Sequence, residues 1–386
     1  MVILKQHGVL RRTALKCGAV VVLAMGLLLT ACQKDPFAPG HVKEGLVYEK
    51  TGIAPDTVAV LADGNEISYD LYLYWLCHST RRIESYLKQN GMDLDWDYEI
   101  SQGTSVLDYV RIDALNSVRY FAVIESMAKE YDVSLSDADK AALQEQKDAY
   151  IAKLGSEKEY LQQIALLGLR PEIYERINAA GRLYSDLYDL YLTEGSRLYA
   201  SDEDVAAYAE AQGAVTADQI LLLTMDMTTK ERYSQDIIDA KIALIEDIYH
   251  RLCDSERPQE LFQELADEYS EDIGRQNYPN GYTYMPGAMI KEFETAAEQL
   301  KPGEFSLITE SVYGFHIIMR KELDVSAAAA GMRNTYFDAL IAARVNAMTI
   351  EMNPQLEQLN IPAYYSAFSA AWESSALFNE SIDSQP

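Results

Sequence analysis

The chain has 386 residues, of which 48% are hydrophobic, and its formal net charge is −27 at pH 7. This length is sufficient for two or three domains, and the apolar content excludes a chain that is disordered throughout. A strongly acidic surface repels phosphate backbones, so we expect no nucleic-acid partner. Solubility alone accounts for the acidity.

The first 31 residues have the pattern of an export signal. Basic residues end at Lys16, and the apolar run 17–31 is too short to span a bilayer comfortably. The run ends Leu29-Thr30-Ala31-Cys32, which resembles the lipobox of bacterial lipoproteins. That resemblance implies cleavage before Cys32, lipidation of its sulfur, and an extracytoplasmic protein that is lipid-anchored to the cell membrane. An uncleaved anchor or an ordinary signal peptide is the alternative.

The stretch 32–55 predicts a flexible tether, because it has no apolar period and is rich in helix-breaking residues. Those residues are Pro36, Pro39, Gly40 and Gly52. Beyond the tether, Cys77 and Cys253 are too few and too far apart for a disulfide framework. We expect both cysteines to be small apolar residues in the core.

Residues 56–212 have the pattern of a helical domain. A short strand and a turn at Asp63-Gly64-Asn65 lead into a helix over 69–87, and an amphipathic helix of about 25 residues follows over 105–131. Three further helices begin with capping boxes, at Ser136/Asp139, Ser156/Glu159 and Ser201/Asp204. Another helix begins at Pro171, where the missing N–H does no harm.

Tyrosine is unusually frequent, at 27 residues, and many lie in these helices. Because tyrosine combines apolar area with a polar tip, one interpretation is an adaptable groove for unfolded polypeptide. The other is ordinary packing between helices, with the hydroxyl groups reaching solvent, and the same physics favours it. The residues concerned are Tyr72, Tyr74, Tyr184, Tyr188 and Tyr191.

A compact α+β unit is predicted after residue 214, where the apolar period changes. The run 217–224 has strand length, and a helix capped by Thr228 or Thr229 would extend to Leu252. The elements expected next are a helix over 261–269, a strand over 281–285, a helix over 290–300, and strands over 305–309 and 314–320. A last helix is expected over 332–352, and the tail after Pro354 is left open.

This order of elements, and three segments within it, resemble the parvulin family of peptidyl-prolyl cis-trans isomerases. The segments are FQELADEYSED (262–272), GAMIKEFETAAEQLKPGEFS (287–306) and YGFHIIMR (313–320). In addition, VAVLADGNEISYDLYLYWL (58–76) resembles the start of PrsA- and SurA-type foldases. With the lipobox, the whole layout is similar to that of a PrsA-type foldase lipoprotein.

The resemblance implies an α+β fold class, in which a parvulin-like domain is inserted into a mostly α-helical chaperone-like domain. The inserted domain would be a four-stranded antiparallel sheet with surrounding helices. The expected boundaries are a lipoprotein signal peptide at 1–31, the tether at 32–55, the helical domain at 56–212, the parvulin-like domain at 213–323, and a C-terminal helix with tail at 324–386. The C-terminal helix would return to the helical domain.

The resemblance also implies the site residues. The pocket for the proline ring would consist of Met289, Phe293 and Tyr284. The polar catalytic positions would be Asp272, His316, Ser311 and Gln219. Without the family match, Met289 and Phe293 would be read as core residues and His316 as a buried, hydrogen-bonded histidine.

The chain departs from the family pattern at Gln219, where parvulins commonly have a histidine in the first strand. Glutamine can keep a hydrogen bond across the site, but it has no ring that titrates. The loop 280–284 also differs from the usual glycine-rich sequence. The sequence therefore predicts an isomerase with reduced activity, or a catalytically inactive parvulin-like chaperone that binds unfolded exported polypeptides.

Isomerisation of an X-Pro bond breaks no covalent bond, so we expect no cofactor and no metal. The five histidines form no cluster with metal-ligand spacing; they are His7, His41, His78, His250 and His316. The expected partners are unfolded or partly folded exported proteins that contain X-Pro bonds, and the membrane; a homodimer is left open. A solute-binding lipoprotein is the third hypothesis, but the chain lacks the alternating strands and helices of that class.

Overall fold

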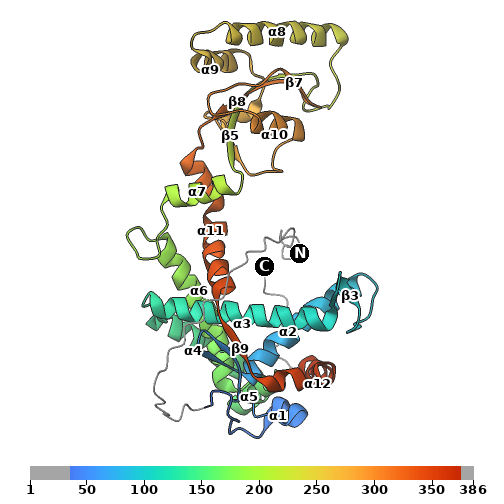
Figure 1. Ribbon diagram of the computed structural model, residues 1–386, viewed down its shortest axis with the longest axis vertical. Helices are drawn as coiled ribbons and strands as arrows, with labels where there is room; N and C mark the ends of the chain where they lie inside the picture. Colours follow the sequence, from blue (N-terminus) through green and yellow to red (C-terminus); the bar gives the residue numbers. More distant parts are fainter. Residues whose placement is uncertain (1–34, 375–386) are drawn as a thin grey trace, which may run out of the picture.

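The computed structural model describes residues 35–374, which form an elongated molecule with a compact head at one end and a larger helical arm at the other (Figure 1). The described part of the chain begins in the arm, enters the head after α7 (Asp202–Ala211) and returns to the arm through α11 (Val325–Ala347). The α+β fold class, with a four-stranded antiparallel sheet inserted into a mostly helical part, is confirmed. The predicted signal segment, including Cys32, lies outside the described residues.

The arm contains helices from both sides of the head. Its helices before the head are α1 (Gly45–Thr51), α2 (Tyr69–Gln89), α3 (Val106–Glu130), α4 (Asp137–Leu154), α5 (Glu157–Leu166), α6 (Pro171–Leu192) and α7. After the head follow α11, the 3-10 helix η3 (Pro354–Gln358) and α12 (Ile361–Glu373). Before the head, the arm also contains two small antiparallel pairings: β1 (Val58–Ala62) with β2 (Asn65–Ser68), and β3 (Glu99–Ser101) with β4 (Thr104–Ser105). No helix within residues 35–374 has the length and apolar character to cross a membrane.

The C-terminal part of the chain is built into the arm. Strand β9 (Ile350–Met352) pairs antiparallel with β1, and the buried amide of Asn353 donates to the carbonyl oxygen of Val58 at 2.9 Å. Helix α12 follows and buries Phe368 and Trp372 in the same core as α2. The tail that the sequence left open is therefore docked as far as residue 374.

The tyrosines of the arm serve packing. Tyr72 and Tyr191 are buried, and Tyr74 packs against the core around α2. The rings of Tyr184, Tyr188 and Tyr191 surround Phe337 of α11, with centroid distances of 5.0–5.6 Å. Tyr184, Tyr188 and Tyr191 thus join helices on the two sides of the head insertion, in agreement with the packing interpretation. The groove for unfolded polypeptide stays a prediction.

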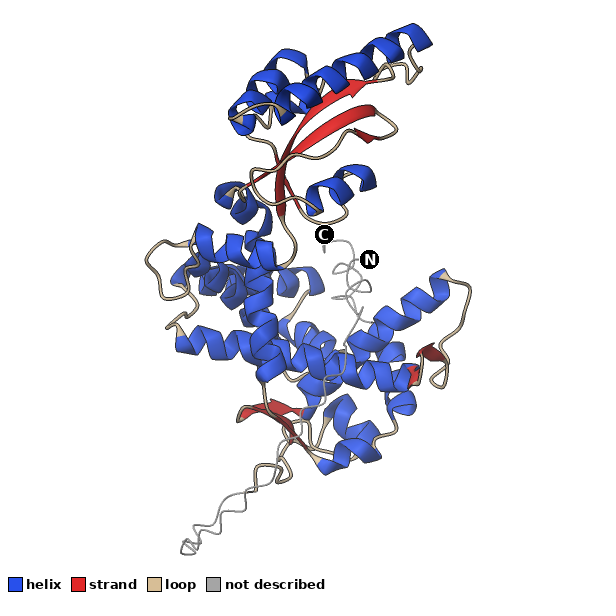
Figure 2. Ribbon diagram, turned by 45° about the horizontal axis from the view of Figure 1, so that its top comes forward, coloured by secondary structure: helices blue, strands red, loops and turns tan. Residues whose placement is uncertain are grey.

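The head has a four-stranded antiparallel sheet in the order β6-β5-β8-β7. Its strands are β5 (Val215–Leu223), β6 (Tyr282–Tyr284), β7 (Thr309–Glu310) and β8 (Gly314–Lys321). Its helices are α8 (Gln235–Cys253), α9 (Pro258–Tyr269), the 3-10 helix η2 (Ile273–Gln276) and α10 (Lys291–Glu298). In Figure 2, α8 and α9 cover one side of this sheet, and α10 lies on its other side.

The alternation of side chains along β5 and β8 divides the head into two layers. On one face Ile220, Leu222, Ile317 and Met319 pack against α8 and α9 in one apolar core. On the opposite face Val215, Ala217 and Ile318 pack against α10 in a second, smaller core. Gln219 lies between Ala217 and Leu221 in this alternation, so its side chain belongs to the face of α10.

Several predicted boundaries change in the structure. The tether predicted over 32–55 is not flexible throughout, because residues 45–51 form α1 and bury Val47 in the arm core. The helix predicted from Thr228 or Thr229 begins instead after Ser234, because the carboxylate of Asp226 accepts from both threonine N–H groups and holds a loop. The capping boxes at Ser136 and Ser201 are confirmed.

Two further helix ends also differ from expectation. At Ser156 the hydroxyl accepts from the N–H of Glu159, and the capping box there is incomplete. The helix predicted over 332–352 is α11, which starts at Val325 because Asp324 caps it. It ends at Ala347, and the next residues form β9. Pro171 stands in the first turn of α6 as predicted.

Candidate active site

Strand pairing brings Gln219 and His316 onto one face of the head sheet. In the β5–β8 register, Leu221 lies opposite His316 and Gln219 lies opposite Ile318. The pairing continues to Gly314, where a side-chain carbon would lie 2.1 Å from the carbonyl oxygen of Leu222, so only glycine fits. The Gln219 amide and the His316 ring are thus diagonal neighbours on adjacent strands.

The segment after α9 brings Asp272 to the same place. The N–H of Glu271 donates to the carbonyl oxygen of Leu221 at 2.7 Å, and the N–H of Leu221 donates to the hydroxyl of Ser270 at 3.1 Å. These bonds hold residues 270–272 beside β5. Asp272 then caps η2 by accepting from the N–H of Gly274 at 2.9 Å.

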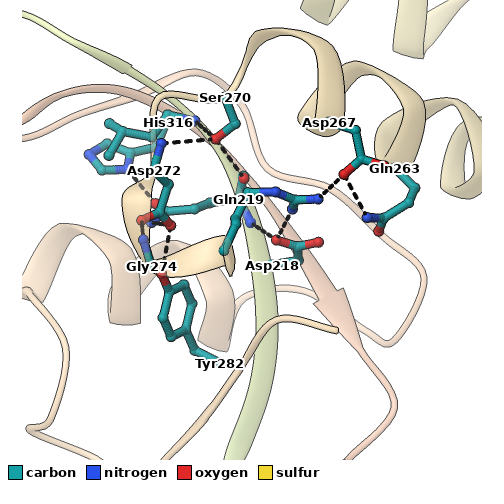
Figure 3. Close-up of polar contacts among 11 residues, drawn as sticks. Asp218, Gln219, Gln263, Asp267, Ser270, Asp272, Gly274, Tyr282 and His316 are labelled. Carbon is teal, nitrogen blue, oxygen red and sulfur yellow. Dashed lines mark hydrogen bonds and ion pairs between the residues drawn. The ribbon is translucent and has the colours of Figure 1, made fainter. Parts of the chain in front are cut away.

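The four predicted polar residues form one continuous hydrogen-bonded chain, part of which is drawn in Figure 3. The hydroxyl of Ser311 lies 2.6 Å from Nε2 of His316, and Nδ1 of that ring lies 2.7 Å from Oε1 of Gln219. At the other end of the amide, Nε2 of Gln219 donates to the carboxylate of Asp272 at 2.7 Å. We name Ser311, His316, Gln219 and Asp272 the polar chain.

The direction of each bond in the polar chain follows from its end at Asp272. A carboxylate accepts at neutral pH, so the amide nitrogen of Gln219 must face it and the amide oxygen must face His316. Nδ1 of His316 therefore carries the proton, and Nε2 of the neutral ring accepts from Ser311. Burial lowers the pKa of His316 to about 4, against the opposing effect of Asp272 and Glu292, so the ring is neutral at pH 7.

Tyr282 is a fifth member of the site that the sequence did not indicate as functional. Its hydroxyl donates to the Asp272 carboxylate at 2.8 Å, and burial together with that hydrogen bond raises the pKa of the phenol. The sequence shows that the loop 280–284 differs from the family pattern, but only the structure shows that the Tyr282 side chain points to Asp272. Asp272 thus accepts from Gln219, Tyr282 and the N–H of Gly274 (Figure 3).

A buried ion pair supports the site from the opposite face of β5. Asp218 and Arg275 lie 2.5 Å apart, and Arg275 also contacts Asp267 of α9 at 2.6 Å. Asp218 is fully buried, and its second carboxylate oxygen has no hydrogen-bond partner in the described structure. Arg275 belongs to η2, so this pair ties the Asp272 segment to β5 and α9.

The predicted proline-pocket residues belong to the apolar cluster on the same sheet face. Phe293 is 2% exposed and its ring meets the Tyr284 ring edge-on, at a centroid distance of 5.8 Å. Burial raises the pKa of Tyr284 to about 12. Met289 is half-buried against this cluster. The structure therefore brings all three residues together beside Ile318, whose strand neighbour on this face is His316.

The main chain around Met289 is held by a carboxylate of α10. Oε1 of Glu294 accepts from the N–H of Met289 at 2.9 Å and from the N–H of Gly287 at 2.8 Å. This contact determines how the loop 285–290 presents the thioether. Among residues 35–374, no three histidine, cysteine or acidic side chains are grouped in a way that could hold a metal ion.

Comparison with known proteins identifies the head. Residues 220–322 match the family model "Rotamase: PPIC-type PPIASE domain". The chain is 27% identical to the "Foldase protein PrsA" of Caldanaerobacter subterraneus subsp. tengcongensis over 285 residues, which is 72% of this chain and 77% of that protein. It is 37% identical to "Foldase protein PrsA 1" of Bacillus cereus over 95 residues, 24% of this chain and 33% of that protein.

A further relative is the "Chaperone SurA" of Chromohalobacter salexigens, 32% identical over 117 residues, which is 28% of this chain and 26% of that protein. The chain thus spans most of one of these three relatives and a third or less of the other two. Among solved structures, a PrsA peptidylprolyl isomerase from Bacillus cereus aligns with 73% of this chain and 93% of its own, at 19% identity and a TM-score of 0.22.

Proposed function

We propose that this chain, which carries a parvulin-type peptidyl-prolyl cis-trans isomerase domain and is similar to PrsA foldases, isomerises X-Pro bonds in unfolded exported proteins at a membrane surface. The head would perform the isomerisation, and the arm would hold the client as a chaperone. The single observation that carries the proposal is the common sheet face of the polar chain and the apolar cluster of Met289, Phe293 and Tyr284.

The chemistry requires a change of amide geometry and no change of covalent bonds. The uncatalysed X-Pro bond isomerises over tens to hundreds of seconds, because its partial double-bond character opposes rotation. A site that binds the twisted amide more tightly than either planar form lowers this barrier. An apolar pocket would fix the proline ring, and polar groups beside it would favour the twisted carbonyl and nitrogen over the planar ones.

Within this proposal Met289 and Phe293 hold the proline ring, and Tyr284 forms the far wall of the pocket. The polar chain would lie along the rotating amide. Because Asp272 fixes the Gln219 amide and Gln219 fixes the His316 ring, the hydroxyl of Ser311 is the group at the open end of the polar chain. Its oxygen can accept from, or its proton can be redirected to, a client amide that approaches.

A peptide assay of cis–trans isomerisation with the full chain tests the proposal. Met289→Ala removes part of the pocket wall, so we expect kcat/KM to fall by about tenfold, as for the loss of roughly 1.4 kcal/mol of apolar contact. The matched control is Met352→Ala, which changes an exposed methionine of the arm and should leave the rate unchanged. No rate above background in the unmodified chain, and no loss with Met289→Ala, would reject an isomerase.

The membrane anchor and the exported clients are separate parts of the proposal. They are supported by the lipobox-like Leu29-Thr30-Ala31-Cys32 and by the similarity to PrsA foldases. A labelled fatty acid should be incorporated into the chain in a bacterial host, and Cys32→Ser should abolish the label and release the protein from membranes. Label retained after Cys32→Ser would reject the anchor.

A second function, chaperone binding without catalysis, is favoured by Gln219 in place of the expected histidine. Under this alternative the apolar cluster would hold X-Pro segments and the polar chain would be structural. The full chain would then slow the aggregation of an unfolded client while the isomerisation rate stays at background. Failure to slow aggregation would count against the chaperone function in both candidates.

A further inference from the structure

The junction between head and arm lies beside a strand that carries residues of the site. In Figure 1, α7 and one end of α11 lie next to the lower end of β5, where the chain passes between arm and head. Strand β6 is three residues long and forms one edge of the head sheet, so within the described residues it pairs with β5 alone. A short edge strand depends on cross-strand side-chain contacts for its position.

The residues of β6 point alternately to the two faces of the sheet. Tyr282 and Tyr284 belong to the apolar cluster on the face of α10. The hydroxyl of Tyr282 donates to the Asp272 carboxylate at 2.8 Å, at the end of the polar chain (Figure 3). Because side chains alternate along a strand, Thr283 between the two tyrosines points to the opposite face. The position of Thr283 therefore determines where the Tyr282 hydroxyl lies.

Thr283 is connected to the arm through Thr216 of β5. The two threonines lie opposite each other in the β5–β6 register, and their hydroxyl oxygens are 2.8 Å apart. The oxygen of Thr216 also accepts from the N–H of Asp324 at 2.9 Å. Asp324 is the N-cap of α11, and its side chain accepts from the N–H of Ala327. We name Asp324, Thr216 and Thr283 the neck link.

Burial gives the neck link its strength. Thr216 is 2% exposed, so water does not replace its partners. Its hydroxyl oxygen has two acceptor sites, of which the N–H of Asp324 uses one, and the O–H of one threonine donates to the oxygen of the other. A buried hydroxyl that loses such a partner is destabilised by the full cost of its desolvation. The first turn of α11 is thus joined to the middle of β6 by two buried hydrogen bonds.

Two glycines hold both ends of β6 close to the neck link. At Gly281, which has a φ of 95°, a side-chain carbon would lie 2.8 Å from the carbonyl oxygen of Ala217, so the chain enters β6 in close contact with β5. At Gly213, which has a φ of 93°, it would lie 2.9 Å from the ring of Pro286. The segment that leaves α7 therefore packs on the loop that leaves β6.

The apolar packing around the neck link is slight. The buried apolar residues at this junction are all alanines, and a cavity of about 70 Å³ remains between α7, α11 and β6. Alanine buries little apolar area, so these contacts contribute little to the position of β6. The hydrogen bonds of the neck link then have the larger share in fixing it. The alanines are Ala206, Ala209, Ala214 and Ala328.

We propose that Thr216 and Thr283 are positioning residues of the isomerase site, which join the first turn of α11 to β6 and so hold the Tyr282 hydroxyl against Asp272. The neck link acts on the polar chain through Tyr282. The arm thereby contributes to the rate of isomerisation as well as holding the client. This inference rests on the proposed isomerase function and adds positioning residues outside the site itself.

A double-variant cycle in the peptide isomerisation assay, with the full chain, tests the neck link. Thr283→Val replaces the hydroxyl by a methyl group of similar shape, and we expect kcat/KM to fall by about fivefold, as for the loss of one hydrogen bond. In the Tyr282→Phe background the same substitution should change kcat/KM by less than about twofold, because the group through which it acts is already absent. Thr283→Ser keeps the hydroxyl and should keep the rate.

A second pair of variants tests the contribution of the arm. Asp324→Ala removes the cap of α11 and keeps the N–H, so it should keep kcat/KM. Asp324→Pro removes both the cap and the N–H that donates to Thr216, and the φ of −71° at this residue allows proline. We expect Asp324→Pro to lower kcat/KM by a factor similar to that of Thr283→Val.

The matched control for the threonine variants is Thr80→Val. Thr80 is fully buried in α2 of the arm, and its hydroxyl donates to the carbonyl oxygen of Leu76 at 2.9 Å. The control loses a buried hydroxyl and its hydrogen bond, as Thr216→Val would, but far from the neck link in the chain. It should leave kcat/KM unchanged.

The outcomes separate this inference from the proposed function. The same fall for Thr283→Val in both backgrounds, no fall at all, or equal rates for Asp324→Pro and Asp324→Ala would each overturn the neck link and leave the isomerase intact. If Thr283→Val loses its circular dichroism spectrum, the two Asp324 variants decide. If the unmodified chain isomerises no peptide, the proposed function fails, and the cycle is read in urea denaturation midpoints. Additive shifts for Thr283→Val and Tyr282→Phe would then overturn the neck link, and a smaller shift in the double variant would support it.

Discussion

The side-chain oxygen of Gln219 lies 2.7 Å from Nδ1 of His316, and the nitrogen of the same amide donates to Asp272 at 2.7 Å. An amide in this position joins a carboxylate to an imidazole without a titrating group between them. It also fixes the direction of both bonds, since its donor and acceptor ends cannot exchange while Asp272 is ionised. Glutamine at position 219, where the resemblance to parvulins implies a histidine, therefore keeps the hydrogen-bonded connection between Asp272 and His316 but provides no ring that can bind a proton.

The first prediction concerns Gln219→Leu, which has a similar volume and no polar atoms. It would leave the buried Nδ1–H of His316 without its partner, while the Asp272 oxygen that accepts from Gln219 would keep the Tyr282 hydroxyl as its donor. A buried group that loses its hydrogen bond costs about 1–3 kcal/mol, so we expect the free energy of unfolding to fall by that amount. Urea denaturation measures it.

The control for this variant is Gln263→Leu. Gln263 also donates to a carboxylate, that of Asp267, at a longer distance of 3.3 Å on the surface of α9. Its loss should change the free energy of unfolding by less than about 0.5 kcal/mol. Equal effects of the two substitutions would mean that the polar chain contributes nothing beyond an ordinary surface contact.

The second prediction concerns pH, because burial lowers the pKa of His316 to about 4 from an ordinary value of 6.5. Below pH 6.5 the unfolded chain binds a proton at this position and the folded chain does not, so stability falls as the pH decreases from 6.5 to 4. The full difference corresponds to about 3 kcal/mol at 1.36 kcal/mol per unit. Above pH 6.5 this contribution is constant.

The measurement is the free energy of unfolding of the wild type and of His316→Gln between pH 7 and pH 4. His78 is buried in the arm and its pKa is lowered to about 3, so the wild type contains two such contributions. The difference between the two proteins isolates that of His316. Parallel curves for wild type and His316→Gln would contradict the prediction, and the exposed His41→Gln variant should follow the wild type throughout.

The fold of the head was largely predictable, because its strands and helices carry apolar patterns and sequence segments that can be recognised without the rest of the chain. A short apolar run indicated β5, and the segments that match the family indicated which side chains belong to the site: Asp272, His316 and Ser311 are joined through Gln219 in the structure. Their catalytic roles stay predictions. The role of Tyr282 was not predictable, because the loop that carries it departs from the family pattern and a loop residue has no period to show its direction.

Helix α1 in the arm and the loop before α8 in the head show where local patterns are insufficient. Helix α1 has seven residues, too few to be stable alone, and it exists because Val47 packs into a core built from distant helices. Thr228 and Thr229 look like helix caps, but Asp226 competes for their N–H groups and forms a loop. In both cases contacts that are distant in sequence, or a competing side chain, determined the outcome.

The third prediction is Tyr282→Phe, which removes one of the three donors to Asp272 and keeps the ring. Asp272 would retain Gln219 and the N–H of Gly274. We expect a loss of about 1–2 kcal/mol in unfolding free energy, because the acceptor is a carboxylate and its other bonds remain. Tyr278→Phe is the control, since it leaves the aromatic contact with Tyr282 and removes a hydroxyl that does not reach Asp272. If Tyr278→Phe destabilises as much, the effect belongs to the loop and not to the hydrogen bond.

The fourth prediction concerns the buried pair of Asp218 and Arg275 beneath β5. Arg275→Met would leave the Asp218 carboxylate buried with no cation, and one of its oxygens already has no partner. Removal of one member of a buried ion pair costs about 3–5 kcal/mol, so urea denaturation should show a loss in this range. Asp218→Asn in the same chain should recover part of it, because the uncompensated charge is then absent.

The matched control, Arg257→Met, breaks the exposed pair with Glu260 and should cost less than about 0.5 kcal/mol. A small loss for Arg275→Met, or no recovery in the double variant, would show that Asp218 reaches water and does not tie the Asp272 segment to the sheet.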